Sequence, residues 1–272
     1  MGKNSSIEWT HHTFNPWWGC AKVSPACKHC YAESWAKRVG QAVWGVASPR
    51  RFFSDAHWRD PLRWQAEAEK AQLTPRVFCA SMADVFEDRD DLVEHRARLF
   101  RLIERTPRLQ WLLLTKRPEH AARLARLAGW KGDWPRNVWA GTTVENQEYA
   151  EERIPHLIGL RARIRFLSCE PLLGPVDLKP WLKSLDWVIA GGESGGKSRP
   201  MAAAWPAGVR DQCVKAGVAF HFKQWGDWAP VDVTMRRLGK KHAGRELDGR
   251  TWDEVPEPCI ATMPGSRVAL AG

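Results

Sequence analysis

The stretch "LQWLLLTKRPEHAARLARLAG" (residues 109–129) joins a short apolar run to a charged helical pattern through a polar turn. A short apolar run bounded by polar residues is typical of a buried strand, and apolar residues that recur three and four positions apart are typical of a helix. The same succession recurs along the chain. The apolar runs that predict strands are residues 76–82, 109–115, 137–144, 163–169, 186–192 and 219–225.

Strands that alternate with helices predict a parallel sheet with right-handed crossovers. Together with "FNPWWGC" (14–20) as a candidate earlier strand, they favour an α/β fold with a parallel (β/α) barrel or a partial TIM-type barrel. A doubly wound open sheet is the alternative. The chain has neither an internal repeat nor a long linker, so residues 1–272 are expected to form one domain. Beyond Gly226 the pattern fades, and residues 227–272 are expected to be an irregular C-terminal extension.

The composition favours an anionic partner. Lys and Arg number 41 against 31 Asp and Glu, which gives a formal net charge of +10, and 17 of the 272 residues are tryptophan. Basic and aromatic side chains together are typical of nucleic-acid binding, although a merely solvated basic surface is the simpler alternative. Arg50 and Arg51, in a basic and aromatic segment at 35–53, are the candidate nucleic-acid-binding residues.

The sequence gives no sign of a membrane partner or of secretion. Its apolar runs fall short of the roughly 20 residues that a membrane helix requires. The N-terminal stretch "MGKNSSIEWTHH" lacks the apolar core of a secretion signal. We therefore expect a cytoplasmic protein, in which clustered cysteines are metal ligands or catalytic groups more often than disulfides.

Polar residues follow every expected strand. In a parallel α/β fold the carboxyl ends of the strands carry the active site. A single polar residue there is usually only a loop residue, but one after each strand predicts a polar rim that could hold an amino acid, a ribose and a phosphate. The rim residues are Asp84, Lys116, Arg117, Glu145, Asn146, Glu170, Glu193 and Lys223.

The stretch "GCAKVSPACKHCYAE" (19–33) places Cys20, Cys27 and Cys30 in one loop. Structural zinc is one interpretation, with a nearby histidine as the fourth ligand. A redox pair at Cys27 and Cys30 is another. The third is a [4Fe–4S] cluster held by three thiolates, which leaves one iron open to a further ligand. A three-cysteine loop after the first strand of a parallel barrel, with a polar rim above it, fits the cluster best.

Several longer segments carry a family resemblance. "IEWTHHTFNPWWGCAKVSPACKHCYAE", "FCASMADVFED", "RFLSCEPLLGPVDL", "WVIAGGESG" and "FKQWG" resemble a phage and bacterial gene-product family with a three-cysteine motif. That family in turn resembles a divergent branch of the radical S-adenosylmethionine (SAM) superfamily. The resemblance runs from about Ile7 to about Pro256. It implies a (β/α) barrel, a [4Fe–4S] cluster on the three cysteines, and SAM on the fourth iron. It also implies an electron donor, whose electron cleaves SAM to a 5′-deoxyadenosyl radical.

The chain departs from the superfamily pattern in two places. The cysteines are separated by six and then two residues, where the superfamily has three and then two. The superfamily's GGE element usually follows the second strand, whereas Gly191–Glu193 follow a later one. Cys169 ends a strand beside Glu170, so both are expected to be catalytic, with the thiol as a hydrogen donor to a radical. The residues expected to bind the cofactor are Asp84, Lys116, Glu145, Asn146, Gly191, Gly192 and Glu193.

The stretch "GGESGGKS" (191–198) matches the P-loop pattern. A P-loop lysine opens a helix, but Pro200 follows closely and weakens that helix. A P-loop nucleotide hydrolase is therefore the least favoured function. The favoured one is radical SAM modification or repair of a nucleic-acid base or nucleotide, since phage genomes often carry altered bases. The main alternative is a zinc-containing, non-catalytic nucleic-acid-binding protein.

Overall fold

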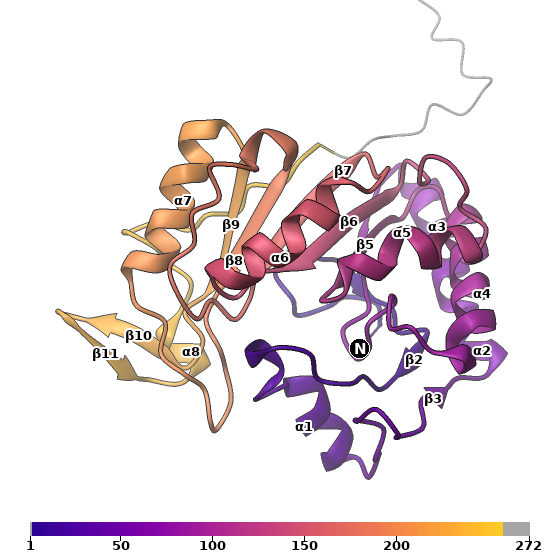
Figure 1. Ribbon diagram of the computed structural model, residues 1–272, viewed down its shortest axis with the longest axis horizontal. Coiled ribbons are helices and arrows are strands. Elements are labelled where there is room, and N and C mark those ends of the chain that lie inside the picture. The colour runs from indigo at the N-terminus through magenta and orange to yellow at the C-terminus, as the bar shows by residue number, and fades with distance from the viewer. Residues whose placement is uncertain (1, 258–272) are drawn as a thin grey trace, which may run out of the picture.

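A seven-stranded parallel sheet forms the centre of the molecule (Figure 1). The computed structural model describes residues 2–257, so Cys259 lies outside the described residues. The spatial order follows the chain, whereas a doubly wound sheet reverses its order at a switch point. The edge strands β1 and β9 do not pair with each other within residues 2–257, so the curled sheet is a half-barrel. Its strands are β1 (His12–Thr13), β4 (Arg76–Cys79), β5 (Gln110–Thr115), β6 (Val138–Thr143), β7 (Ile164–Cys169), β8 (Trp187–Gly191) and β9 (Ala219–Gln224).

The six strands expected from apolar runs are all present, with slightly shorter bounds. The candidate earlier strand at 14–20 was wrong in its position. Strand β1 ends at Thr13, and Pro16 has no N–H with which to continue the ladder. The chain leaves the sheet there, and β2 (Trp17–Trp18) pairs antiparallel with β3 (Arg51–Phe52) in a separate ribbon.

Helices lie along the outer face of the sheet, and α1 lies apart from them near the open side of the half-barrel (Figure 1). Local signals fix several helix ends. Pro118 occupies the first turn of α5, the Asn146 side chain caps α6, and Gly217 ends α7 in the left-handed region. The helices are α1 (Tyr31–Arg38), α2 (Asp55–Trp58), α3 (Asp60–Ala71), α4 (Val93–Glu104), α5 (Pro118–Leu127), α6 (Gln147–Ile158), α7 (Ala204–Ala216) and α8 (Lys240–Ala243).

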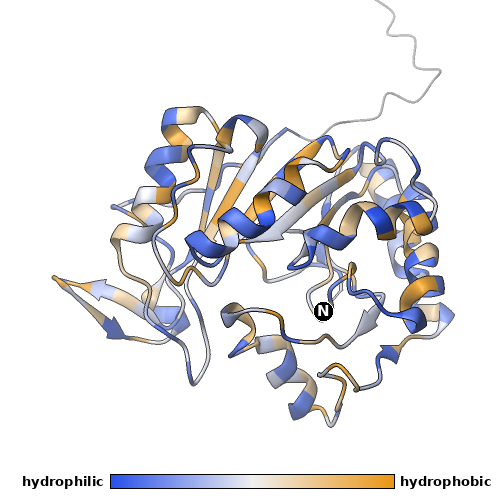
Figure 2. Cartoon of the chain, viewed as in Figure 1, coloured by the Kyte–Doolittle hydropathy of each residue, from blue (hydrophilic) through white to orange (hydrophobic). Residues whose placement is uncertain are grey.

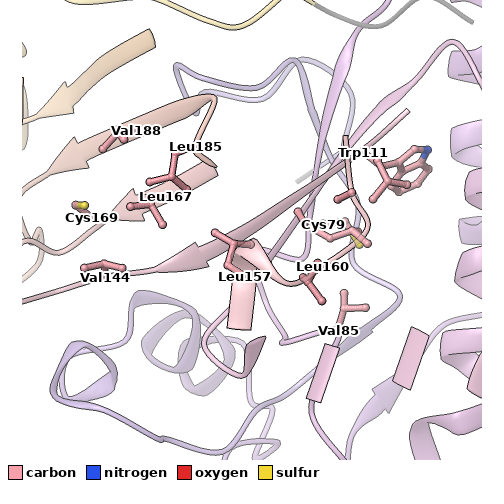
Figure 3. Close-up of a cluster of buried hydrophobic side chains, with 14 of the residues drawn as sticks. Cys79, Val85, Trp111, Val144, Leu157, Leu160, Leu167, Cys169, Leu185 and Val188 are labelled. Carbon is pink, nitrogen blue, oxygen red and sulfur yellow. The ribbon is translucent and has the colours of Figure 1, made fainter. Parts of the chain in front are cut away.

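Side chains alternate between the two faces of the sheet, as the period of two in a strand requires. Figure 2 shows apolar and polar residues alternating around the surface helices, and the outer-face core that these helices cover includes Trp111, Leu167 and Val188 (Figure 3). The inner face carries a second cluster rich in aromatic rings. Its buried members are Trp9, Phe78, Leu112, Trp139, Ile164, Phe166, Trp187 and Ile189.

One glycine makes room for this inner cluster. A Cβ at Gly141 would lie 2.3 Å from the Phe166 ring, so no larger residue fits on β6 at that point. The aromatic cluster fills the interior of the half-barrel. It leaves the carboxyl ends of the strands for a pocket.

The C-terminal extension is more ordered than the sequence suggested. Strands β10 (Trp228–Val231) and β11 (Thr234–Arg237) form a hairpin. The Phe222 N–H donates to the Trp252 carbonyl at 2.9 Å, which ties the extension to β9. Among the described helices, none has the length and apolar character needed to span a bilayer.

Candidate active site

The cysteine loop is anchored to the sheet just before its first thiol. The Gly19 N–H donates to the Met82 carbonyl at 3.0 Å. The backbones of Cys20 and Trp44 pair in an isolated parallel β-bridge. Gly19 has a φ of +117°, and a Cβ there would lie 2.4 Å from the Val43 carbonyl oxygen. Only glycine fits this position, which brings Cys20 against the rim of the half-barrel.

The three cysteines border one pocket of about 170 Å³ at the carboxyl ends of the strands. The charged side chains of Lys116, Glu170 and Lys223 line the same pocket, together with the hydroxyls of Thr143 and Ser168. Trp9 and Phe78 line it as well and belong to the inner aromatic cluster, so this cluster forms an aromatic floor. The predicted meeting of the cysteine loop with a polar rim is therefore present for part of the rim. The cysteines at the pocket are Cys20, Cys27 and Cys30.

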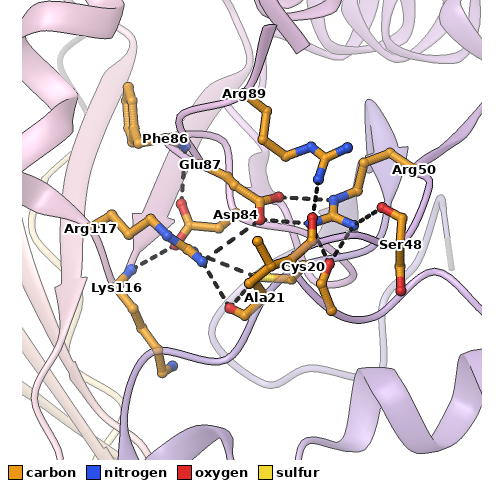
Figure 4. Close-up of polar contacts among 12 residues, drawn as sticks. Cys20, Ala21, Ser48, Arg50, Asp84, Phe86, Glu87, Arg89, Lys116 and Arg117 are labelled. Carbon is orange, nitrogen blue, oxygen red and sulfur yellow. Dashed lines mark hydrogen bonds and ion pairs between the residues drawn. The ribbon is translucent and has the colours of Figure 1, made fainter. Parts of the chain in front are cut away.

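Arg117 contacts Cys20 and is itself paired with Asp84 (Figure 4). Arg117 donates to Asp84 Oδ2 at 3.1 Å, to Cys20 Sγ at 3.6 Å and to the Ala21 carbonyl at 2.8 Å. Asp84 also accepts from the Thr115 hydroxyl at 2.6 Å and from two backbone N–H groups. Asp84 thus acts as a structural anchor of the loop, although one edge of it lines the pocket.

Burial and ion pairing shift the pKa values of the groups in this network. Burial alone would raise the pKa of Asp84, but Arg117 and the donated hydrogen bonds outweigh burial and lower it. Burial, and next the Asp84 charge, raise the pKa of the Cys20 thiol to about 12, against the opposing effect of Arg117. Burial also raises the pKa of Cys30. Metal binding at these thiols would therefore release protons.

The prediction that Arg50 contacts nucleic acid was wrong. Its side chain is fully buried, and Nη2 pairs with Glu87 Oε1 at 2.7 Å (Figure 4). The same guanidinium donates to three backbone carbonyls of residues 43–48, so it holds the segment after α1. Arg51 is exposed and lies over the Trp18 ring, with 4.7 Å from its guanidinium carbon to the ring centroid. Its predicted role in binding nucleic acid stays a prediction.

Three lysines line the pocket, of which Lys22 pairs with Glu33 and the other two lie at the carboxyl ends of β5 and β9. Lys223 Nζ lies 2.5 Å from Glu170 Oε2, and both side chains are largely buried. Lys116 Nζ donates to the Thr143 hydroxyl at 3.2 Å and has no carboxylate partner within the described residues. An ammonium group that lacks a carboxylate can bind an anionic group of a ligand.

Two rim residues serve the fold instead of the pocket. Glu145 is fully buried and pairs with Arg153 at 2.9 Å. The Asn146 side chain accepts from the Tyr149 N–H as the cap of α6. The structure therefore brings neither to the pocket, which corrects their prediction as cofactor-binding residues.

The segment 191–193 packs against β9 and the cysteine loop. A Cβ at Gly192 would lie 1.9 Å from the Trp225 carbonyl oxygen, so the glycine permits backbone-to-backbone contact. Glu193 receives two bonds from the Arg199 side chain and lies 3.2 Å from His29 Nδ1. Gly191, Gly192 and Glu193 support the pocket from outside its lining. Helix α7 begins only at Ala204, so Lys197 does not open a helix as a P-loop lysine does.

Cys169, which was predicted to donate hydrogen to a radical, does not line the pocket. It is fully buried in the outer-face core (Figure 3), and burial raises its pKa. The alternation along β7 sends its neighbours Ser168 and Glu170 to the pocket instead. Glu170 keeps its predicted place at the site.

Several residues that line the pocket were not predicted from the sequence, namely those of the aromatic floor and some polar residues at its sides. Trp9 and Phe78 lie on the inner face, and Thr143 and Ser168 line the pocket at the ends of β6 and β7. Tyr31 also lines it and donates its hydroxyl to the Ser81 carbonyl at 2.9 Å. The signal that could have found the wall is the strand period, because Thr143 and Ser168 are the last inward positions of their strands.

The positions of the potential ligand atoms bear on whether a single metal ion could bind here. In residues 2–257, no group of three or more His, Cys, Asp and Glu side chains lies close enough to hold one metal ion. The described cysteines are all free thiols. Of these, Cys20, Cys27 and Cys30 border the pocket, and with the described His, Asp and Glu side chains they do not form a group that could hold one metal ion.

These features define an α/β half-barrel with a three-thiol, lysine-containing pocket at the carboxyl ends of its strands. The chain belongs to the family described as Protein of unknown function (DUF5131), whose family model matches residues 4–256. Searches of curated proteins and of solved structures found no match to the chain.

Proposed function

We propose that this protein is an iron–sulfur enzyme of the radical SAM type that acts on a nucleic-acid base or nucleotide. The observation that carries the proposal is the shared pocket: Cys20, Cys27 and Cys30 border it together with Lys116, Glu170 and Lys223. A cluster on the three thiolates, with SAM on its open iron, would supply a 5′-deoxyadenosyl radical on receipt of one electron. The resemblance of the sequence to the radical SAM superfamily supports the same proposal.

The donor set suits a cluster better than a single ion. Soft thiolates favour iron–sulfur clusters, and the three thiols border the pocket as free groups. A zinc site needs four ligands around one point. A cubane cluster has its irons at separate corners, so it accepts thiolates that lie apart. This difference is why zinc is the second candidate.

The walls of the pocket suit a charged, planar ligand. Lys116 and Lys223 can hold a carboxylate or phosphate, and Glu170 can hold an ammonium group. The hydroxyls of Thr143 and Ser168 can bond to a ribose. These groups would orient SAM and the substrate so that the reacting atoms meet.

The floor suits an aromatic ring. Trp9 and Phe78 lie with their ring centroids 4.6 Å apart at the base of the pocket. The Trp9 Nε1 hydrogen is buried and has no acceptor among the described residues. A base or an adenine on this floor would bury its apolar faces. The floor would also keep water away from a radical.

The test is metal and product analysis of protein purified without oxygen. We expect iron and sulfide in the wild type, and 5′-deoxyadenosine after addition of SAM and dithionite. The variants C20A, C27A and C30A should each lose the iron. C213A is the matched control, because Cys213 is buried in the outer-face core away from the pocket. Iron retained by all three pocket variants, or zinc in place of iron, would contradict the proposal.

The substrate class needs its own measurement. The rate of SAM cleavage should rise with DNA or a nucleotide more than with a peptide, since the net charge of +10 attracts anions. A base in a duplex would have to flip out to reach the pocket, so single-stranded DNA should stimulate more strongly. Equal stimulation by a peptide would remove nucleic acid from the proposal and leave the cluster.

A further inference from the structure

A second cavity lies outside the half-barrel, between α2, α3 and α4. It has a volume of about 220 Å³ and is distinct from the three-thiol pocket. Two arginines of α4 line it, Arg98 and Arg101, together with Arg105 at the C-terminal cap of that helix and Arg59 from the junction of α2 and α3. Residues spaced by three and four lie on one face of a helix, so α4 presents a row of guanidinium groups.

The charges around this arginine cavity are not balanced. Asp55 is its one acidic lining residue, and it pairs with Arg98 at 2.6 Å. The guanidinium of Arg98 also lies over the Trp58 ring, 4.4 Å from its centroid. The other three arginines are exposed and have no ion-pair partner in the described part of the chain. They are Arg59, Arg101 and Arg105.

The ring of Trp58, which also lines the cavity, carries one further donor. Trp58 is almost fully buried, and its Nε1 hydrogen has no acceptor within residues 2–257. Like charges held together on one face repel each other, and an anion would relieve that repulsion. The cavity therefore offers several donors, with one carboxylate that is already paired.

We propose that the arginine cavity binds phosphate groups of a nucleic-acid backbone. Guanidinium groups match phosphate oxygens in pairs, and arginine is well suited to recognise them. From Arg98 to Arg105 the helix rises about 10 Å. That length exceeds one phosphate group and corresponds to about three steps along the axis of a duplex, in which each strand carries one charge per about 3.4 Å of axis. The row therefore fits a backbone better than a free phosphate.

The arginine cavity is connected to the cysteine loop through short contacts. Helix α2 follows β3, which pairs with β2 just before Cys20. His57 of α2 lies 2.9 Å from the Asn15 carbonyl. Arg51, exposed on β3, lies between the two regions in the sequence and can add a phosphate contact. The inference rests on the nucleic-acid part of the proposed function and on none of its redox chemistry.

The experiment is a binding titration of fluorescent single-stranded and duplex oligonucleotides at several salt concentrations. The test variant is R59A/R101A/R105A. The matched control is R126A/R136A/R163A, which removes three exposed arginines elsewhere and therefore the same charge. Urea midpoints establish that each variant is folded, and R101Q/R105Q is a milder second test variant.

We expect the test variant to lose at least about tenfold in affinity and its log–log salt slope to fall by about two to three, since each lost phosphate contact removes about 0.7–0.9. The control should stay close to the wild type. Equal losses in both triple variants, or no oligonucleotide binding by the wild type, would overturn the inference. Inorganic phosphate and a mononucleotide serve as competitors. If either binds as tightly as the oligonucleotide, the cavity is a small-anion site and the backbone assignment fails.

Iron content and SAM cleavage, measured on the same proteins, separate this inference from the proposed function. Loss of oligonucleotide binding with unchanged iron supports the arginine cavity alone. A wild type that binds oligonucleotide through these arginines but carries no iron would refute the radical chemistry and leave the cavity assignment intact.

Discussion

Replacing Asp84 with alanine should destabilise the fold strongly. Asp84 is 5% exposed and receives four hydrogen bonds, from Arg117, the Thr115 hydroxyl and two backbone N–H groups. The substitution would leave a buried guanidinium without its nearest carboxylate. It would also leave three other donors without an acceptor.

The size of the expected loss depends on which partners Arg117 retains in the variant. Breaking a buried ion pair by removing one partner costs about 3–5 kcal/mol. Glu87 still lies 3.8 Å from Arg117 and the Ala21 carbonyl still accepts from it, so part of the charge stays compensated. We therefore expect a loss near the lower end, about 3 kcal/mol in the free energy of unfolding.

Urea unfolding followed by tryptophan fluorescence measures this loss. D88A is the matched control, because Asp88 lies in the same loop and pairs with Arg123 at 2.5 Å with both side chains about half exposed. An exposed pair contributes about 0–1 kcal/mol. If the free energies of unfolding of D84A and D88A differed by less than about 0.5 kcal/mol, the structural role given to Asp84 would be refuted.

The pH dependence of the free energy of unfolding at acid pH gives an independent check on the role of Asp84. Its pKa is lowered in the folded state, so the unfolded state takes up a proton at a higher pH. The stability that Asp84 contributes is therefore present above its ordinary pKa of about 4 and is lost as the pH falls below it. D84N, which keeps the shape without the charge, should unfold with a weaker dependence on pH in that range.

Three further outcomes are expected. Burial, and next Arg245, lower the pKa of His221 to about 4; the free energy of unfolding should fall by about 2–3 kcal/mol between about pH 7 and about pH 4.5, and urea titrations of H221F should show much less of that fall. G192A should cost about 1–3 kcal/mol because its Cβ would meet a backbone carbonyl, whereas G208A, which faces open space in α7, should leave the urea midpoint unchanged or raised. K223M should lower the rate of 5′-deoxyadenosine formation at least about tenfold by unpairing Glu170, with little change in iron content; an unchanged rate would remove the lysine from the site.

The strands and the place of the site were predictable because both depend on local sequence. Parallel strands are buried on both faces and read as short apolar runs. Their carboxyl ends share one edge of the sheet, so Lys116, Glu170 and Lys223 could be expected to meet the cysteine loop there. The strand period also held information that was not used, since it places Ser168 inward and Cys169 outward.

The role of each charged residue was not predictable from local patterns. Arg50 finds Glu87 across 37 positions, and Arg117 finds Asp84 across 33. Such pairs form only when the chain has folded, so a basic residue in a loop looks the same whether it serves a ligand or the core. The same reason explains why Glu145 was counted with the rim.

The net charge of +10 gains meaning once it is divided between core and surface. Three buried arginines are neutralised by buried carboxylates, so these pairs add nothing to the surplus. Arg96 is buried without a carboxylate and bonds to two backbone carbonyls, which accounts for one charge. Almost all of the surplus must therefore lie at the surface, where salt can screen it and an anion can reach it. The arginine cavity gathers three unpaired guanidinium groups in one place. A steep salt dependence of nucleic-acid binding that disappears with these three residues would show that the surplus is concentrated there.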